Sequence, residues 1–473
     1  MQELMIPLHT KSEIPLYQQI CEYIKTEIQC GHLRAGEKLP SSRALSKYLT
    51  VSRSTVELSY DQLVSEGYIE AVSCKGYYVC DIQGLYYPEK PSKEIFSTEK
   101  KQKSVVEEKV LYDFALNGID AQGFPYSAWQ KLSRRVLGEA DAEDFQLGDP
   151  CGEFGFRKAV AEYLYQARGV HCSAEQIIIG AGNDYLLMLL GTILSRDKKV
   201  IMENPTYLTA YYDFLHMGFQ VETINQDKGG IDCRELEKSS GDIVYVMPSH
   251  QFPMGTVMPL NRRMALLSWA GKRAERYIIE DDYDSEFRYK GKPIPALKGF
   301  DSHDCVIYIG TFSKSIAPSI RVSYMVLPNR LMERYRERKN LFSVTVSKVD
   351  QRILELFLKE GYYERHLNKM RGIYKSKHDI LLKKLKEMPD ICIPSGEYAG
   401  VHMLLVFQNG LTEQEAVSLA AKEGIKVYGL SEYSILGDPK TSRSVLLGYA
   451  CMEEREISDA MDVLKRVWEK RTS

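Results

Sequence analysis

Residues 306–326 read VIYIGTFSKSIAPSIRVSYMV, an apolar run followed by a polar loop and a second apolar run. The loop holds Lys314 beside the hydroxyl side chains of Thr311 and Ser313, and Arg321 follows seven positions later. A lysine held next to an aldehyde acts as a Schiff-base nucleophile, and hydroxyl groups with an arginine suit a phosphate ester. A single lysine is usually a solvated surface group, but these neighbours predict that Lys314 binds a phosphorylated aldehyde cofactor.

Similar apolar runs recur through the second part of the chain and alternate with amphipathic helical stretches. Each run is short and continuous, which is typical of strands in a parallel sheet that is covered on both faces. The alternation of strands and helices predicts an α/β domain. The runs lie at 176–180, 199–205, 242–248, 277–281 and 306–310.

A glycine turn follows the first of these runs and precedes an expected helix. It consists of Gly180, Ala181, Gly182 and Asn183. The first backbone N–H groups of a helix can bind an anion. A dinucleotide-binding turn would need a third glycine where Tyr185 stands, so a single phosphate is the better prediction. Alone, such a turn is more often just a tight connection.

Five further side chains suit contacts to a pyridine ring or to a carboxylate. Asp281 ends an apolar run and could pair with a pyridinium nitrogen, which keeps the ring protonated and makes it an electron sink. Tyr207 could stack on an aromatic ring, and either His250 or Gln251 could bind a ring hydroxyl. Arg443 could hold a carboxylate with two hydrogen bonds. Each of these residues, taken alone, would more often have a structural role.

The first 80 residues predict a separate small module. Residues 15–30 carry apolar side chains at i, i+4 spacing, which predicts an amphipathic helix. Ser41 and Ser42 after Pro40 predict a second helix, and Ser52 is a good N-cap for a third. Two short strands joined by a turn at Gly76 follow. This order predicts a winged helix-turn-helix.

Positive charge in this module is local. Residues 1–80 contain eight Lys or Arg and nine Asp or Glu, but the segment 34–53 holds five basic residues and one acidic residue. Arg43 and Lys47 would meet phosphates, and Arg53 in the first turn of the third helix could reach a base edge. The alternative is a helical packing domain with a solvated charged face.

The pattern of residues 14–80 is more specific than its charge. It contains PLYQQI, G-x-L-x-x-G-x-x-L-P-S-x-R-x-L, R-S-T-V-x-x-x-Y-x-x-L-x-x-E-G-Y-I and K-G-Y-Y-V. This stretch resembles the DNA-binding domain of the GntR family of bacterial repressors. The resemblance implies binding to double-stranded operator DNA. The contact positions that it implies are Arg43, Ser52, Arg53, Thr55 and Gly76.

Residues 112–470 resemble fold type I aminotransferases in the order of their motifs. The resemblance implies pyridoxal 5′-phosphate, with Lys314 as the Schiff-base lysine and the 180–183 turn at the phosphate. It also implies Asp281 at the pyridine nitrogen, Arg443 at a substrate carboxylate, and further cofactor contacts from Tyr207, Tyr283, Thr311, Ser313 and Arg321. The element P-S-H-Q-F-P-x-G and the fused winged helix resemble the MocR branch of GntR regulators, with the γ-aminobutyrate-sensing member as the nearest comparison.

We therefore expect three segments: a winged helix-turn-helix at 1–80, a linker at 81–111 and an aminotransferase-like effector domain at 112–473. Within the linker, 11 of the residues 89–109 are charged and none is glycine, so the segment cannot bury enough apolar surface to order itself.

The net charge of the chain is −2, which excludes a protein that binds nucleic acid through an overall excess of positive charge. The start of the chain lacks the apolar region of a signal peptide, and the ten cysteines are scattered singly, which predicts a cytoplasmic protein without a membrane span. The histidine spacing predicts no metal site.

Two functional hypotheses remain open. The first is a transcriptional regulator in which an amine effector displaces Lys314 and forms an external aldimine. The second is a working aminotransferase with an accessory DNA-binding module. We favour the regulator, with weak or half-reaction transaminase chemistry left open, because a stand-alone transaminase has no use for a winged helix. The resemblance implies a homodimer, and a single arginine for carboxylates, with Thr209 in place of a second, favours a γ-aminobutyrate-like monocarboxylate effector.

Overall fold

The computed structural model divides the chain into two compact units, Met1–Val105 and Val106–Ser473. It describes residues 6–9, 12, 14–82, 110–289, 294–396, 399–435, 437 and 440–469. Most of the predicted linker, 83–109, lies outside the described residues.

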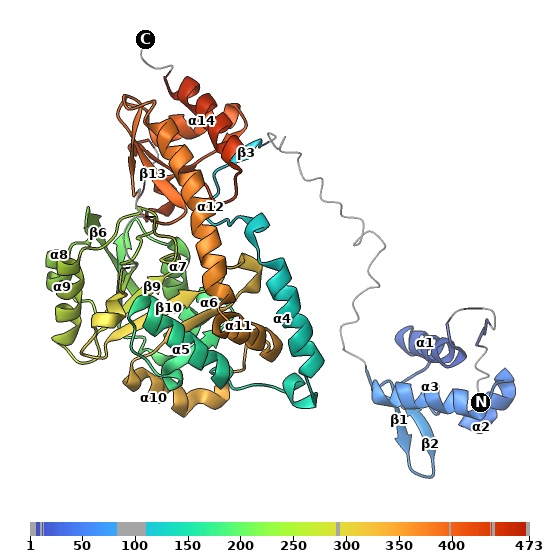
Figure 1. Ribbon diagram of the computed structural model, residues 1–473. Coiled ribbons are helices and arrows are strands. Elements are labelled where there is room, and N and C mark those ends of the chain that lie inside the picture. The colour runs from blue at the N-terminus through green and yellow to red at the C-terminus, as the bar shows by residue number, and fades with distance from the viewer. Residues whose placement is uncertain are drawn as a thin grey trace. The chain divides into compact units, whose positions relative to one another are not determined.

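The first unit contains three helices and a two-stranded antiparallel hairpin (Figure 1). Ser41 and Ser52 cap the second and third helices, because their side-chain oxygens accept hydrogen bonds from the backbone N–H groups of Ala44 and Thr55. Tyr60 is fully buried at the centre of the apolar core. The winged helix-turn-helix prediction is confirmed, with α1 (Leu16–Gln29), α2 (Ser42–Leu49), α3 (Arg53–Ser65), β1 (Ile69–Val72) and β2 (Gly76–Val79).

An eight-stranded sheet forms the centre of the second unit, in the order β4-β11-β10-β9-β8-β5-β6-β7. The five apolar runs quoted from the sequence are all strands of this sheet, and they are parallel to one another. β11 and the edge strand β7 run in the opposite direction to the other strands of this sheet. The strands are β4 (Ile177–Gly180), β5 (Lys199–Asn204), β6 (Gln220–Asp227), β7 (Gly230–Ile231), β8 (Ile243–Val246), β9 (Tyr277–Asp282), β10 (Val306–Thr311) and β11 (Ser323–Val326).

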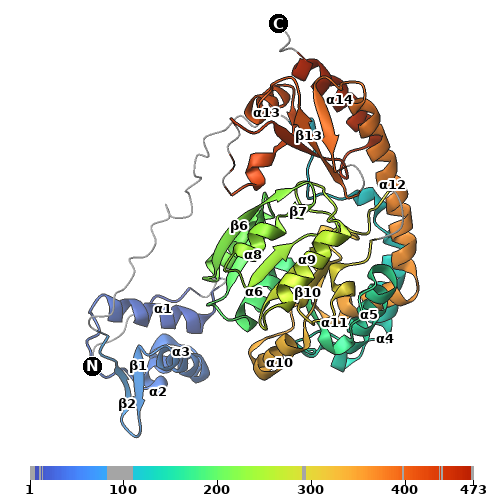
Figure 2. The ribbon, with the colours of Figure 1, turned by 90° about the vertical axis from the view of Figure 1, so that its left-hand side faces the viewer.

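Helices cover both faces of this sheet (Figure 2). One face packs against α6 (Asn183–Ile193), α7 (Leu208–His216) and α10 (Asn329–Arg338). The other packs against α5 (Phe154–Arg168), α8 (Cys233–Lys238) and α9 (Leu260–Gly271). Neighbouring residues of a strand point to opposite faces, which is why strands buried on both faces are apolar throughout.

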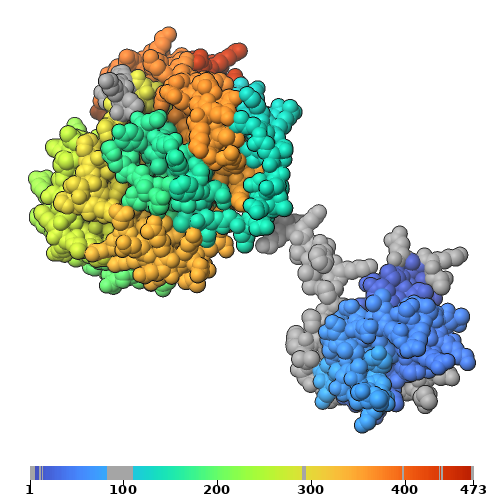
Figure 3. Space-filling model, turned by 60° about the horizontal axis from the view of Figure 1, so that its bottom comes forward, coloured from blue at the N-terminus to red at the C-terminus, as the bar shows by residue number. Residues whose placement is uncertain are grey.

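Two segments far apart in the sequence pack against each other, and the second of them also packs on α5. They are α4 (Tyr126–Glu139) and the pair α11 (Lys348–Lys359) and α12 (Tyr362–Leu385), coloured teal and orange in Figure 3. Trp129 and Phe357 pack edge to face at 5.8 Å, and Arg135 forms an ion pair with Glu360.

A smaller antiparallel sheet of order β12-β13-β16-β15 completes the second unit. Helices α13 (Glu413–Lys422) and α14 (Glu454–Glu469) pack against it together with the end of α12. Among the described residues, no helix has the length and apolar character needed to cross a membrane. The strands are β12 (Cys392–Ser395), β13 (His402–Phe407), β15 (Tyr428–Gly429) and β16 (Ser444–Gly448), and β3 (Tyr112–Asp113) pairs separately with β14 (Ile425–Lys426).

Candidate functional site

A cavity of about 280 Å³ lies where the carboxyl ends of the parallel strands meet. This edge is the usual ligand-binding position in open α/β sheets. Chain segments that follow β4, β5, β8, β9 and β10 all contribute to its lining. Nine of the residues predicted from the sequence line it: Gly182, Asn183, Tyr207, Asp281, Tyr283, Thr311, Ser313, Lys314 and Arg321.

Lys314 lies in the loop after β10, and its amine is directed into the fold. The Nζ atom donates a hydrogen bond to the carbonyl oxygen of Leu116 at 2.8 Å. Burial lowers the pKa of Lys314 to about 8, although the Asp284 carboxylate opposes this shift. A sizeable fraction of the amine is therefore neutral near physiological pH, which is the form that attacks an aldehyde.

One end of the cavity suits an anion. Helix α6 begins there at Asn183, directly after Gly182, and the guanidinium of Arg321 lies beside that turn. A Cβ atom at Gly182 would lie 2.3 Å from Nη2 of Arg321, and Gly182 has a φ of +96°. Glycine is therefore required for this approach. The buried Ser313 hydroxyl oxygen has no hydrogen-bond partner within the described chain, which leaves it available to a phosphate.

Asp281 supplies a buried carboxylate to the cavity. Asn183 Nδ2 donates to Asp281 Oδ1 at 3.2 Å, and the Tyr245 hydroxyl donates to the other oxygen. Burial raises the pKa of Asp281 to about 7, because the neighbours supply hydrogen bonds but no positive charge. A cationic ring nitrogen at this position would stabilise the ionised carboxylate.

The next residue along β9 serves the packing of the fold. Asp282 points to the opposite face of the sheet, where its Oδ2 lies 2.8 Å from Nη2 of Arg168 and 2.6 Å from the Tyr308 hydroxyl. The alternation of side chains along a strand thus separates two adjacent aspartates into a cavity carboxylate and an internal ion pair.

His250 and Gln251 do not reach the cavity, contrary to the predicted contact with a ring hydroxyl. Gln251 is 2% exposed and donates to the carbonyl oxygen of Pro205 at 3.1 Å. His250 lies behind Tyr283, with 2.9 Å between its Nδ1 and the Tyr283 hydroxyl. The residue that faces the cavity from this loop is Phe252. The sequence analysis considered only the polar residues His250 and Gln251, whereas the apolar residue next to them, Phe252, lines the cavity.

Other predicted positions support the cavity from outside its lining. Gly180 belongs to β4 and pairs with Ser323, and the backbone N–H of Ala181 donates to the Thr345 hydroxyl at 3.1 Å. These residues hold the turn, whereas Gly182 and Asn183 form its inner surface.

Arg443 lies away from the cavity, which contradicts its predicted contact with an effector carboxylate. It is exposed and directly precedes β16. The other end of β16, at Gly448, hydrogen-bonds to Phe114, two residues before the carbonyl that Lys314 contacts. Five strand residues at about 3.3 Å each separate Arg443 from that end by roughly 16 Å.

A larger cavity, of about 390 Å³, lies among α5, α11 and α12. It is lined by Tyr163, Glu286 and Tyr363 among others, and by none of the residues that the sequence predicted for the site. The smaller cavity combines a buried lysine with a buried carboxylate and a glycine turn at a helix N-terminus, so it is the candidate functional site.

The predicted DNA-contacting residues of the first unit are displayed on its surface. Arg43 and Lys47 are exposed on α2, and Arg53 is exposed in the first turn of α3. The Nε of Arg53 lies 2.7 Å from Oε1 of Glu57, one turn along the same helix. Ser52 caps α3 by accepting from Thr55, and Gly76, with a φ of +106°, begins the second strand of the hairpin.

Known proteins match both units. Residues 16–79 match the family described as bacterial regulatory proteins, gntR family, and residues 120–464 match aminotransferase class I and II. The uncharacterized HTH-type transcriptional regulator YdeL of Bacillus subtilis (strain 168) is 39% identical, with 98% of each chain covered. The probable rhizopine catabolism regulatory protein MocR of Rhizobium meliloti is 28% identical, over 98% of this chain and 95% of that one. The chain belongs to the MocR branch of the GntR family.

A solved structure has the same fold as the second unit. The kynurenine aminotransferase of Pyrococcus horikoshii, in complex with PMP, superposes with a TM-score of 0.70 at 23% identity, covering 83% of this chain and 99% of that one. The match shows that this MocR-type regulator carries a fold type I aminotransferase fold. Its function at the coarse level is transcriptional regulation through a GntR helix-turn-helix domain.

Several residues of the MocR-type site were missed by sequence reasoning. Tyr245 lies 36 positions before Asp281, on the neighbouring strand β8, and Phe252 lay within a motif whose polar residues drew the assignment. Asp284 and His402 meet His250 in a buried group that joins the two parts of the second unit. Only the pairing of strands brings these residues together, so nothing in their local sequence marks them.

Proposed function

We propose that this MocR-type protein is a pyridoxal phosphate-dependent transcriptional regulator that senses a small amino compound at Lys314. The observation that carries the proposal is a single cavity that combines a buried lysine amine with a pKa near 8 and an anion-binding turn. The effector amine would replace Lys314 at the cofactor aldehyde carbon, so that one C–N bond forms, one breaks and Lys314 leaves as a free amine. The loss of this tether would change the preferred geometry of the second unit.

The residues of the cavity fit pyridoxal phosphate. Arg321, the unpartnered Ser313 hydroxyl and the start of α6 would hold the phosphate. Asp281 would hold the ring nitrogen in its protonated form, and Tyr207 would pack on the ring. Bound there, the cofactor supplies an aldehyde carbon for an amine and an electron-withdrawing ring.

The geometry supports an amine in the effector more strongly than a carboxylate. Among the described residues that line the cavity, Lys314 and Arg321 are the only cations, and both are assigned to the cofactor. Since Arg443 lies elsewhere, the prediction of a γ-aminobutyrate-like monocarboxylate loses its main support. We therefore propose a primary amine as the required group and leave a carboxylate as an optional one.

An absorbance titration tests this proposal. Holoprotein would be titrated with amines of matched length that carry or lack a carboxylate, and operator binding would be followed in parallel by gel shift on DNA upstream of the gene. We expect amine-dependent spectral changes that alter operator binding. An effector-independent gel shift together with an unresponsive spectrum would refute the proposal.

The alternative is an active aminotransferase with an accessory DNA-binding module, which the similarity to solved aminotransferases favours. Steady-state turnover with an amine donor and a 2-oxoacid acceptor separates the two functions. We propose that turnover is absent or limited to a half-reaction. The homodimer, the cytoplasmic location and the segment boundaries at 80 and 111 stay predictions.

A further inference from the structure

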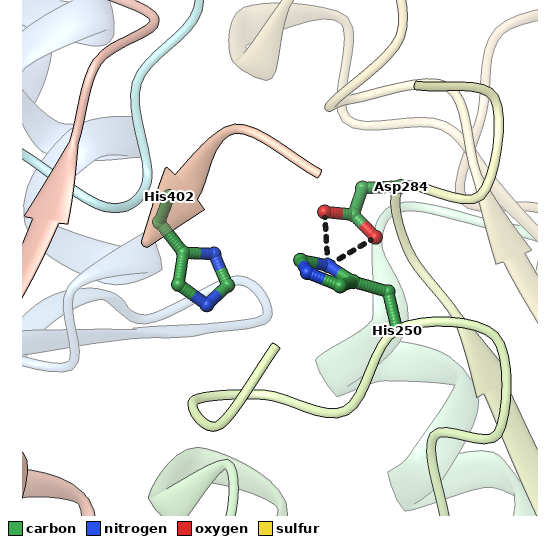
Figure 4. A group of neighbouring side chains, drawn as sticks. All are labelled: His250, Asp284 and His402. Atoms are coloured by element: carbon green, nitrogen blue, oxygen red, sulfur yellow. Dashed lines mark hydrogen bonds and ion pairs between the residues drawn. The ribbon is translucent and has the colours of Figure 1, made fainter. Parts of the chain in front are cut away.

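A buried group of three side chains lies directly behind the cavity, and its role follows from its hydrogen bonds. His250, Asp284 and His402 come from separate segments and point toward one another (Figure 4). His250 Nδ1 lies 2.8 Å and 3.1 Å from the two carboxylate oxygens of Asp284 and 2.9 Å from the hydroxyl of Tyr283. Tyr283 in turn lines the cavity.

The Asp284 carboxylate determines which ring nitrogen of His250 carries a proton. An ionised carboxylate only accepts hydrogen bonds, so a nitrogen at 2.8 Å from it must donate. With the proton on Nδ1, His250 can also donate to the oxygen of Tyr283, but it cannot accept the hydroxyl proton of that tyrosine. Burial and the Asp284 charge raise the pKa of Tyr283 well above its usual range, so the hydroxyl keeps its proton. Since His250 Nδ1 cannot accept that proton, its acceptors are the Asp284 carboxylate, with which the hydroxyl also hydrogen-bonds, or a group bound in the cavity.

The surroundings hold His250 in this arrangement. Gly400 lies against the ring, where a Cβ atom would be 1.9 Å from Cε1 of His250. His402 donates through Nε2 to the carbonyl oxygen of Pro253 at 3.0 Å, and burial lowers its pKa far below the usual value, so it is neutral. His250 Nε2 is buried without a hydrogen-bond partner in the described chain. Within the described chain, the ring therefore makes its hydrogen bonds through Nδ1.

We propose that His250, fixed by Asp284, is a positioning residue that makes Tyr283 a hydrogen-bond donor to the phenolic oxygen of the cofactor. This inference rests on the proposed cofactor site. A donor at that oxygen stabilises negative charge on it and therefore favours the deprotonated form of the bound chromophore. Charged and titratable groups near this network are Asp281, Asp284, Lys314 and His402, and the charge of Asp282 acts on it from the other face of the sheet.

Two substitutions at one position test the proposal. In His250→Asn the amide nitrogen replaces Nδ1 and keeps a donor near Asp284 and Tyr283, whereas in His250→Gln the amide reaches the position of Nε2 instead. Both variants and wild type would be reconstituted with pyridoxal phosphate, and visible absorbance would be followed against pH. We expect the midpoint to rise by about one pH unit in His250→Gln, the size of one lost hydrogen bond, and to stay near wild type in His250→Asn.

The Tyr283→Phe background distinguishes positioning from a general structural effect. If His250 acts through Tyr283, adding His250→Gln to Tyr283→Phe should move the midpoint no further, whereas independent effects would add. Additive shifts, or equal midpoints in wild type and His250→Gln, overturn the proposal. Stoichiometric metal in the purified protein that is lost in His402→Gln would overturn it too, since the three side chains would then be ligands. If wild type gives no visible band at all, the proposed cofactor site fails instead.

Discussion

The two units display their functional residues in opposite ways. In the first unit the predicted DNA-contacting residues Ser52, Arg53 and Thr55 lie within one helical turn, and a local side-chain cap positions them. In the second unit the cavity draws its residues from the ends of five strands, and Lys314 lies 198 positions from the carbonyl that its amine contacts. The predicted contacts on α3 thus depend on local sequence, whereas the cavity depends on the order of strands in a sheet.

The two units also differ in how far these side chains are buried. Arg43, Lys47 and Arg53 are exposed, whereas the cavity groups Asp281 and Lys314 are buried and have pKa values shifted by burial to about 7 and about 8. A substitution on the DNA-binding surface should therefore change one contact. A substitution in the cavity should change the charge balance of its surroundings, so the largest effects are expected there.

Replacement of the reactive lysine should have the largest effect. In Lys314→Ala, covalent attachment of pyridoxal phosphate should be abolished, because no other described lysine lines the cavity. Mass spectrometry after borohydride reduction should find the cofactor on Lys314 in wild type and on no single residue in the variant. Lys272→Ala, at an exposed lysine paired with Glu237, is the control and should retain attachment. Stoichiometric attachment in Lys314→Ala would exclude this site.

Substitutions of the adjacent residues Asp281 and Asp282 should have different effects, the first on cofactor affinity and the second on the free energy of unfolding. Asp281→Asn removes the carboxylate from the cavity and should weaken cofactor binding on the order of 100-fold, as for a buried charge that loses its partner. Asp282→Asn instead leaves Arg168 buried without its counter-charge and should lower the free energy of unfolding by about 3–5 kcal/mol. Cofactor titrations and denaturant unfolding of both variants measure the two effects. Equal loss of cofactor affinity in both would contradict the assignment of Asp281.

Arg53→Ala should weaken operator binding by about 1–3 kcal/mol, the range for a lost two-point base contact. Since Arg53 belongs to a different unit from the cavity, the cofactor spectrum should not change. Gel shifts and absorbance spectra measure the two properties on the same preparations. Arg455→Ala, at an exposed arginine of α14, is the matched control and should bind the operator normally. Unchanged affinity in Arg53→Ala would show that α3 does not read the operator in this register.

The pH dependence of cofactor capture should give a smaller, graded effect. The neutral form of Lys314 increases as pH rises through its pKa of about 8, so attachment to the apoprotein should be roughly tenfold slower at pH 7 than at its plateau above pH 9. Stopped-flow absorbance across this range measures the rate. A plateau already reached at pH 7, or one displaced beyond pH 10, would show that burial does not shift this amine.

The fold and much of the cavity follow from local sequence, and the errors have a common physical cause. The five apolar runs and the helix caps were predicted because each depends on residues within one turn or one strand. His250, Gln251 and Arg443 were placed in the cavity wrongly, and Phe252 was missed, because the direction of a side chain depends on strand pairing across the second unit. The Tyr245 contact to Asp281 was missed for the same reason, since it needs β8 beside β9.

Arg443→Ala should have the smallest effect, and it tests the correction that the structure makes to the sequence. If Arg443 held the effector's carboxylate, its removal would cost about 1.5–3 kcal/mol, or at least tenfold in affinity. Its exposed position before β16, about 16 Å from the strand end near Lys314, predicts a change of about twofold or less, as for a surface residue. Spectral titration of wild type and variant with γ-aminobutyrate and with an amine of equal length that lacks the carboxylate measures both affinities. A tenfold loss confined to the carboxylate-bearing amine would restore the sequence-based assignment, and would mean that Arg443 reaches a cavity in the assembled protein that one chain alone does not form.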